Sequence, residues 1–334
     1  MDFNFTEEQL AVQEAARDFA QLVLKPGVIE RDRGAIYPTA EVKEMAEMGF
    51  LGMMVSPEYG GIGMDTISYA LAMEEIAKVD ASAAVIMSVN NSLVCWGLET
   101  YGNEEQKQKY LTKLAPGEWI GAFCLSEPEA GSDATHQRTT AEDKGDYYLL
   151  NGTKNWITNG GTSNIHLVIA QTEPEKRHKG INAFIVEADW EGVEIGHKED
   201  KMGIRGSDTT SIMYNNVKVP KENRIGENGF GFNFAMNTLN GGRIGIASQA
   251  LGIAQGAYEL AVQYSQEREA FGKPIAKHQA IAFKLAEMAT DIQAARLLIH
   301  RAAWLKDQHK DFIMASAMAK YFAAEMAMKH TTEA

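Results

Sequence analysis

The strongest constraint on the fold is a change of hydrophobic period that occurs twice along the chain. Apolar residues follow helical spacing over residues 5–114, and helical spacing returns from Phe230 onward. Between these parts the sequence breaks into short β-branched and aromatic runs separated by turn residues. This order predicts an α+β protein with a helical domain over residues 1–117, an all-β domain over 118–226 and a helical bundle over 227–334.

Local signals agree with that division. Thr6 stands where an N-cap opens the first helix, with glutamates directly after it. Asn151 and Gly152 lie between two strand-like runs, and an Asn-Gly pair in that setting predicts a β-hairpin. One apolar stripe at alternating four- and three-residue steps predicts a bundle helix; it comprises Ile281, Leu285, Met288, Ile292, Ala295 and Ile299.

Composition narrows the class of function. The chain has 334 residues, of which 45% are hydrophobic, as in a packed globular protein. Its formal net charge of −13 disfavours nonspecific binding to nucleic acid or to anionic lipid. Cys95 and Cys124 are too few for a disulfide framework or a zinc site, and the eight histidines lack metal-ligand spacing. We therefore expect a reducing compartment and no metal site.

The N-terminal residues and the apolar stretches of the sequence bear on where the protein is located. The first residues are acidic and become amphipathic at once, unlike a secretory signal or a transit peptide. No stretch reaches the roughly 18 uninterrupted apolar residues of a membrane span. The sequence predicts a cytoplasmic protein without a membrane span.

Two segments of the β domain could carry a ligand site. The first is "FCLSEPEAGSDA", where Gly131 would let the backbone approach a ligand and Ser126 and Ser132 would supply hydroxyl groups; composition alone favours a surface turn. The second is "NWITNGG", where strand alternation places Trp156 and Thr158 on one side. A packed strand tryptophan is the alternative for this segment.

Two features of the C-terminal helices also need an explanation. Gly241 and Gly242 lower the stability of a helix, so their presence is better explained by their lack of a side chain than by helix propensity. Space for a bound ligand is one reason for a helix to lack side chains at these positions. Arg268 precedes a helix break, where it is either a solvated charge or a clamp for phosphate. The chain has no G-x-S-x-G elbow and no Walker loop, and its glycine clusters lack the strand-to-helix context of a dinucleotide fingerprint.

Six motifs in order carry a resemblance to a known family. They are "LSEPEAGSD", "NGTKNWITNGG", "MGIRGSDT", "VKVPKENRIG", "GGRIGIASQALGIAQGA" and "EREAFGKPIAKHQAIAFKLAEM". Together they resemble the acyl-CoA dehydrogenase family, and most closely its short-chain (butyryl-CoA) branch, from "FTEEQ" to the last residue. The resemblance implies an N-terminal helical domain, a β-barrel-like middle domain and a C-terminal four-helix bundle that is incomplete at its end.

The resemblance also implies an activity and its partners. Members of the family bind FAD, oxidise an acyl-CoA to the trans-2-enoyl-CoA, pass electrons to an electron-transferring flavoprotein and assemble as homotetramers. By this resemblance the flavin-lining residues are Phe123, Leu125, Ser126, Gly131, Ser132, Trp156, Ile157 and Thr158, with Thr158 near the reactive flavin nitrogen. Arg268, Phe271 and Gln279 would reach the FAD of a neighbouring subunit, and Ser132, Asn240, Gly241, Gly242 and Arg243 would contact the acyl-CoA.

The general base is where the chain departs from the family pattern. Most members use a glutamate in a "YEGT-E" type loop near the C-terminus, and the sequence stops at "KHTTEA" before such a segment. A minority take a glutamate directly before the arginine that matches Arg243, and this position holds Gly242. The expected base therefore lies beyond Ala334, and no residue of the chain is assigned that role.

Two readings of the missing base stay open at this point. Either the sequence is a truncated record of a short-chain acyl-CoA dehydrogenase, or it is a short non-catalytic protein that binds flavin or acyl-CoA. The mass of the native protein separates them, because 36.7 kDa would argue against truncation. An acyl-CoA oxidase is a further alternative, because oxygen access decides the electron acceptor.

Overall fold

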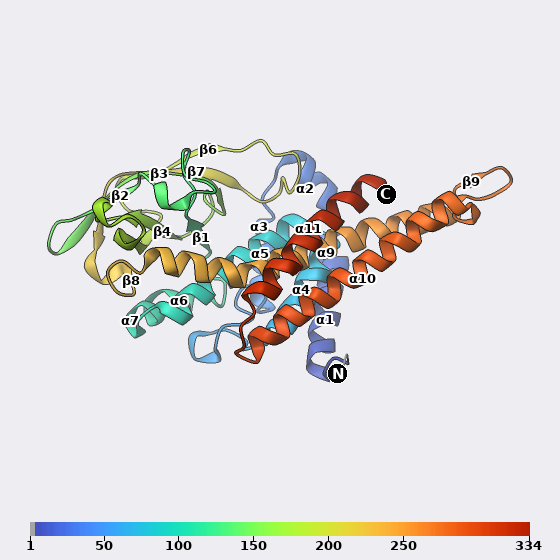
Figure 1. The fold of residues 1–334 in the computed structure, drawn as a ribbon, viewed down its shortest axis with the longest axis horizontal. Coiled ribbons are helices and arrows are strands. Elements are labelled where there is room, and N and C mark those ends of the chain that lie inside the picture. Colours follow the sequence, from blue (N-terminus) through green and yellow to red (C-terminus); the bar gives the residue numbers. More distant parts are fainter. Residues whose placement is uncertain (1–3) are drawn as a thin grey trace. The chain divides into compact units, whose positions relative to one another are not determined.

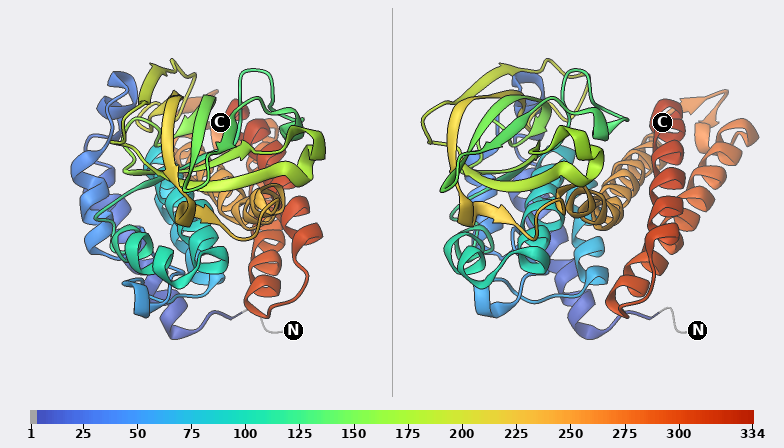
Figure 2. Two further views of the ribbon diagram at one scale, coloured as in Figure 1. Left: turned by 90° about the vertical axis from the view of Figure 1, so that its left-hand side faces the viewer. Right: turned by 60° about the vertical axis from the view of Figure 1, so that its left-hand side comes forward.

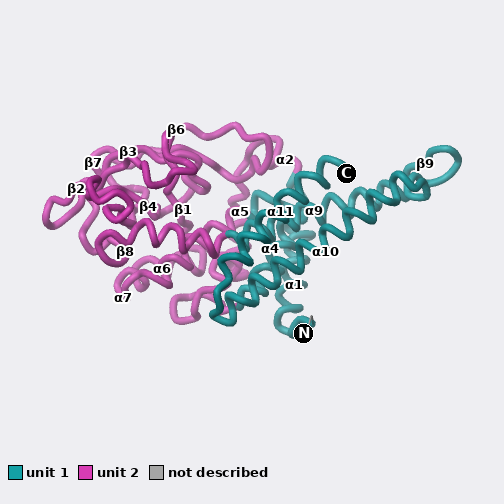
Figure 3. The backbone as a smooth tube through the Cα atoms, viewed as in Figure 1, with its two compact units in different colours: residues 1–28, 65–84, 243–334 teal, residues 29–64, 85–242 magenta. Residues whose placement is uncertain are grey.

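The computed structural model describes residues 4–334, so the expected domain 1–117 begins with three residues outside the described part. The chain forms two compact units (Figure 3). The first contains the described residues up to Val28 together with Asp65–Ala84 and Arg243–Ala334, and the second contains Ile29–Met64 and Val85–Gly242. Their border differs from the three consecutive domains expected from the sequence.

The first unit is helical (Figure 1). Thr6 caps its first helix, because its hydroxyl accepts a hydrogen bond from the Gln9 N–H and the Gln9 Oε1 accepts one from the Thr6 N–H. Its helices are α1 (Glu7–Phe19), α4 (Thr66–Ala77), most of α9 (Gly231–Glu267), α10 (Gln279–Asp307) and α11 (Ile313–Glu333). A short hairpin of β9 (Glu269–Ala270) and β10 (Lys273–Pro274) joins α9 to α10.

Helices α4, α9, α10 and α11 share one apolar core. Small side chains dominate it, which lets the helix backbones approach closely. The predicted stripe of α10 is buried at Met288, Ile292, Ala295 and Ile299 but only partly buried at Ile281 and Leu285. Helix α4 thus joins the C-terminal helices, although sequence order assigns it to the N-terminal part.

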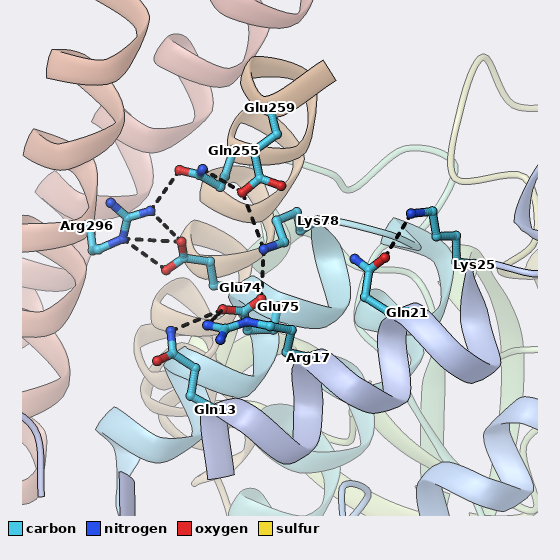
Figure 4. Close-up of polar contacts among 10 residues, drawn as sticks. All are labelled: Gln13, Arg17, Gln21, Lys25, Glu74, Glu75, Lys78, Gln255, Glu259 and Arg296. Atoms are coloured by element: carbon cyan, nitrogen blue, oxygen red, sulfur yellow. Dashed lines mark hydrogen bonds and ion pairs between the residues drawn. The ribbon is translucent and has the colours of Figure 1, made fainter. Parts of the chain in front are cut away.

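Buried charges connect these helices as well. Glu74 and Glu75 of α4 are almost completely buried, and each pairs with an arginine from a different helix (Figure 4). Arg296 of α10 donates to Glu74 at 2.5 Å, and Arg17 of α1 donates to Glu75 at 2.7 Å. Lys78 lies 2.9 Å from the second Glu75 oxygen. Glu74 and Glu75 are adjacent in α4 and therefore link this helix to two different helices, α10 and α1.

The second unit combines short helices with a sheet. Its helices are α2 (Val28–Gly34, from Ile29 on), α3 (Thr39–Glu47), the second half of α5 (Ala81–Ser88), α6 (Trp96–Tyr101), α7 (Glu104–Gln106) and α8 (Thr112–Leu114), and the first turns of α9 belong here too. The strands are β1 (Gly121–Cys124), β2 (Thr140–Asp143), β3 (Tyr147–Thr158), β4 (Ile165–Gln171), β5 (Ile181–Glu187), β6 (Val193–Lys198), β7 (Thr209–Pro220) and β8 (Arg224–Ile225).

The sheet has the strand order β6-β7-β3-β2-β4-β5-β8, with β1 parallel to β4. Figure 2 shows these strands curving around a common interior. Apolar residues of β1, β2, β3, β4, β5 and β7 fill that interior. The expected helical, β and helical order along the chain is confirmed, with a curved sheet in the middle.

The predicted hairpin at Asn151 and Gly152 is wrong. Residues 147–158 form the single strand β3, and the pairing with β7 shifts between Leu150 and Gly152, as at a β-bulge. A Cβ on Gly152 would lie 2.6 Å from the Thr139 Cα, so the glycine is explained by close approach of a neighbouring backbone. The same residue pair that favours a turn also fits this bulge.

One helical stretch, Ala81–Tyr101, is long and apolar enough to cross a membrane, and 78% of its most apolar window is buried in the structure. Its asparagines are bonded inside the protein. Asn90 donates to the Leu51 carbonyl at 2.9 Å, and Asn91 donates to the Phe50 carbonyl at 2.7 Å. A core helix of a globular unit has these properties.

Candidate functional site

The first candidate segment begins at strand β1 and continues into a tight loop. Phe123 is partly buried and stacks on Phe234 with ring centroids 6.2 Å apart. Glu127 and Ala130 exchange backbone hydrogen bonds, which closes the loop. Beyond this closure Gly131 and Ser132 are exposed, and a Cβ on Gly131 would meet no atom within 4 Å. The loop therefore leaves open space where the sequence predicts a close approach to a ligand.

The second candidate segment is the end of strand β3. Trp156 is 62% exposed, and its backbone φ is +62°, a left-handed value that a bulky residue rarely adopts. Thr158 is half-buried, and Ile157 between them is buried in the sheet interior. Trp156 and Thr158 thus lie on the side opposite the core, and the alternative of a packed strand tryptophan is wrong.

The structure brings these two segments together. The Asn155 N–H donates to the Ser126 carbonyl oxygen at 2.9 Å, and the Lys154 Nζ donates to the Leu125 carbonyl oxygen at 3.0 Å. The segment that carries the exposed Trp156 ring is therefore hydrogen-bonded directly to the loop that follows β1. A flat aromatic face beside hydroxyl groups and open backbone fits a planar ring system with polar edges.

A buried ion pair lies beneath this junction. The Lys154 Nζ donates to the Glu127 Oε1 at 2.7 Å, and both side chains are almost inaccessible to water. Burial lowers the pKa of the Lys154 ammonium, although Glu127 opposes that shift. Burial also acts to raise the pKa of Glu127, but Lys154 and backbone N–H donors outweigh it and hold that pKa below its ordinary value.

Burial limits what one predicted flavin-lining residue, Ile157, can offer to a ligand. The Ile157 side chain is 2% exposed and packs inside the sheet, so it faces away from the surface of Trp156 and Thr158. The register of β3 against β7 shifts between Lys154 and Ile157, and after this shift Ile157 pairs with Thr210 and its side chain packs in the sheet interior. Only the backbone of Ile157 remains available to a ligand on that surface.

The glycine pair lies inside helix α9, which begins at Gly231. Gly241 and Gly242 are both buried. A Cβ on Gly242 would lie 2.7 Å from the Leu93 Cδ2, so a leucine side chain fills the space left by this glycine. The predicted role of Gly242 toward the acyl-CoA stays a prediction. Asn240 and Arg243 flank the pair and are partly buried.

The clamp candidates lie on the hairpin after α9, in the other unit. Arg268 follows the end of α9, where its N–H bonds to the Tyr264 carbonyl, and its side chain is exposed. Phe271 is 96% exposed with φ of +54°, and Gln279 at the start of α10 is exposed. In a single chain these three side chains are exposed, so they can contact either solvent or a partner subunit.

Sequence reasoning missed three charged residues that hold the site. Glu127, Lys154 and Asp208 are buried, and each lies within a motif quoted for the resemblance. The only sequence signal for a buried charge of this kind is a lysine or carboxylate inside a motif that otherwise predicts a strand. Among residues 4–334 no cluster of three or more His, Cys, Asp or Glu side chains is placed to hold a metal ion.

The fold and the site define a class of protein: helices, a curved sheet and helices in order, with an exposed tryptophan and hydroxyl-bearing loop on the sheet. Three family models match the chain in the same order. They describe the acyl-CoA dehydrogenase N-terminal domain over residues 6–118, the middle domain over 122–217 and the C-terminal domain over 229–334. The chain belongs to the acyl-CoA dehydrogenase family, a family of oxidoreductases.

Individual relatives agree. The mitochondrial short-chain specific acyl-CoA dehydrogenase of Mus musculus is 48% identical over 96% of this chain and 78% of its own length. The solved butyryl-CoA dehydrogenase of Megasphaera elsdenii is 46% identical with a TM-score of 0.98, covering 100% of this chain and 88% of that one. A chain from a structural study of the electron transferring flavoprotein of Acidaminococcus fermentans is 49% identical with a TM-score of 0.98 and the same coverages.

Proposed function

We propose that this protein catalyses FAD-dependent α,β-dehydrogenation of a short-chain acyl-CoA, such as butyryl-CoA, to the trans-2-enoyl-CoA, and passes the electrons to an electron-transferring flavoprotein. The observation that carries the proposal is the hydrogen bond between Asn155 and Ser126, which joins the two segments expected to line the flavin. The names of the similar proteins supply the acyl length and the electron acceptor.

The residues present fit a flavin. Trp156 offers an exposed aromatic ring, and Ser132 and Thr158 offer hydroxyl donors at positions not taken up by the core. Bound FAD would accept the β-hydrogen as hydride. The protein would hold the flavin ring against Trp156 with Thr158 as a hydrogen-bond donor, and backbone groups around Gly131 and Ser132 would approach its polar edge.

The acyl-CoA would lie beside the first half of helix α9. Asn240 and Arg243 are the polar side chains of this stretch that the proposal assigns to the substrate. The reaction also needs a carboxylate to remove the α-proton, and Gly242 cannot supply one. The base stays unassigned among the residues of this sequence, and a location in the cytoplasm stays a prediction.

We propose a homotetramer as the working assembly. The apolar residues exposed on the first unit support it, because large exposed apolar surface is typical of subunit interfaces. They lie on α9, α10 and α11 and include Leu260, Tyr264, Phe283, Leu297, Trp304, Met314, Met318, Tyr321 and Met328. Arg268 and Phe271 would then reach a neighbouring subunit.

Anaerobic titration of the FAD-loaded protein with butyryl-CoA tests the activity. A protein that supplies the required carboxylate should bleach the visible flavin absorbance, and the absorbance should return when an electron-transferring flavoprotein is added. Rapid return on exposure to air alone would favour an acyl-CoA oxidase. A shifted but unbleached flavin spectrum would instead favour the non-catalytic binding protein, which the absence of a carboxylate at Gly242 keeps as the second candidate.

A further inference from the structure

The backbone at Trp156 is held in an unfavourable conformation. Its φ of +62° belongs to the left-handed region, where a large side chain crowds the neighbouring carbonyl group. The β3–β7 register also shifts between Lys154 and Ile157, so the ladder itself does not impose regular strand geometry here. Residues in such conformations persist when their surroundings determine them from several sides.

Lys154 fixes the chain two residues before the tryptophan. Its ammonium donates to three acceptors, the Leu125 carbonyl at 3.0 Å, the Glu127 carboxylate at 2.7 Å and the Gln137 amide oxygen at 3.2 Å. These bonds use all three donors of a lysine. Glu127 in turn accepts the N–H groups of Arg138 at 2.5 Å and Thr139 at 3.1 Å.

Asp208 fixes the chain after the tryptophan. Its carboxylate accepts the Gly161 N–H at 2.6 Å and the Thr162 hydroxyl at 3.0 Å, and its backbone carbonyl accepts the Asn159 N–H at 3.2 Å. Asn159 also has a φ of +62°. Two buried carboxylates thus hold the two ends of a short segment in which the Trp156 side chain is exposed.

Stability alone gives a poor reason for the Glu127–Lys154 pair. Removing two charges from water is costly, and apolar residues of similar volume often replace a buried pair without loss of stability. We propose that Glu127, Lys154 and Asp208 are positioning residues that impose the left-handed backbone of Trp156 and so set the face its ring presents to the flavin. The flavin part of this inference rests on the proposed function; the backbone part stands without it.

A ¹⁹F NMR experiment tests the backbone part in flavin-free protein. The chain has five tryptophans, and Trp156→Phe assigns one 5-fluorotryptophan resonance to Trp156. We expect the double variant Glu127→Gln with Lys154→Met to shift or broaden that resonance and to leave the other four in place. Asp208→Asn should move the same resonance from the other end of the segment, which keeps the test open if the double variant does not fold.

Matched variants separate positioning from general damage. Lys154→Arg keeps the charge and should restore part of the native signal. Lys144→Met removes an exposed lysine paired with Glu142 at 2.6 Å and should leave the Trp156 resonance unchanged. Folded double and Asp208→Asn variants with a native Trp156 resonance would overturn the proposal.

FAD affinity tests the flavin part. We expect the double variant to raise the FAD dissociation constant by about tenfold or more while Lys144→Met stays within about twofold of the native value. If the native protein binds no FAD, the proposed function fails, whereas the NMR result still decides whether these three residues position Trp156. A shifted resonance with native FAD affinity would overturn only the role toward the flavin.

Discussion

At the scale of single residues, His166 shows how burial controls a titratable group. It lies in strand β4 with no exposed surface, its Nδ1 is 3.1 Å from the Tyr214 hydroxyl, and its Nε2 has no hydrogen-bond partner among residues 4–334. Burial lowers the pKa of His166 to about 4. The imidazole is therefore neutral in the folded protein at pH values where a free histidine takes up a proton.

This shift predicts a pH dependence of stability. The unfolded chain binds a proton at His166 below about pH 6.5, whereas the folded chain binds it only near pH 4, so stability falls as the pH drops through this window. The slope from this residue is about 1.4 kcal/mol per pH unit. Urea unfolding at pH 7, 6 and 5 should show a smaller loss for His166→Gln than for the native protein, and equal losses would contradict the prediction.

At the scale of elements, the pair of Glu74 and Arg296 links α4 to α10. The Glu74 side chain is 7% exposed and the Arg296 side chain is 22% exposed. Removing the arginine alone would leave a buried carboxylate without its partner. The loss of stability depends on this unpaired buried charge more than on the number of hydrogen bonds lost.

Arg296→Met should therefore lower the free energy of unfolding by about 3 kcal/mol, the lower end of the range for breaking a buried pair. Replacing Glu74 by leucine in the same chain should recover most of the loss, because both charges are then gone. Lys329→Met, which breaks an exposed pair with Glu287, should cost no more than about 1 kcal/mol. If urea unfolding shows the same loss of unfolding free energy for Arg296→Met and Lys329→Met, this prediction is refuted.

Two glycines of helix α9 give a second contrast between elements. A Cβ on Gly252 would lie 2.4 Å from the Glu74 carbonyl oxygen of α4, and backbone cannot move aside easily. A Cβ on Gly242 would meet the Leu93 Cδ2, the end of a flexible side chain. Both changes to alanine gain about the same helix propensity, roughly 1 kcal/mol, so packing decides the difference.

We expect Gly252→Ala to lower stability by about 1–3 kcal/mol and Gly242→Ala to stay within about 1 kcal/mol of the native protein. Thermal unfolding of the two variants under one set of conditions measures the difference. A Gly252→Ala protein as stable as the native one would show that α4 and α9 can separate without cost.

These elements also show what the sequence could predict. The Thr6 cap and the strand runs depend on neighbouring residues, so local patterns identify them. The bulge at Gly152 depends on the backbone of Thr139, and the Glu127–Lys154 pair joins the loop after β1 to strand β3, so neither follows from local patterns. The motif resemblance identified the site segments, but it could not reveal the left-handed φ of Trp156 or the inward side chain of Ile157.

At the scale of the whole molecule, sequence order and compactness divide the chain differently. Helices α1 and α4 come from the first quarter of the sequence and belong to the unit of α10 and α11. Helix α9 is continuous across the border at Gly242 and Arg243. Trp156 belongs to the second unit and Arg268 to the first.

The proposed assembly makes a prediction about Arg268. If its guanidinium holds the FAD of a neighbouring subunit, Arg268→Ala should reduce the flavin content after gel filtration and leave the melting temperature of the flavin-free protein unchanged. Arg301→Ala removes another exposed arginine, on α10, and should retain native flavin content. Native flavin content in Arg268→Ala would refute the clamp role.

Mixing variants tests whether the contact runs between subunits. Arg268→Ala and Trp156→Ala chains should each retain little FAD alone. In a C2 pair that shares residues, one mixed pair holds one site with both native residues and one site with neither, so random mixing by co-refolding should restore about a quarter of the sites. If each site used residues of one chain only, mixing would restore none. Flavin content per chain after gel filtration of the mixture distinguishes these outcomes, and a mixture no better than its components would place Arg268 and Trp156 at the same chain's site or at no flavin site.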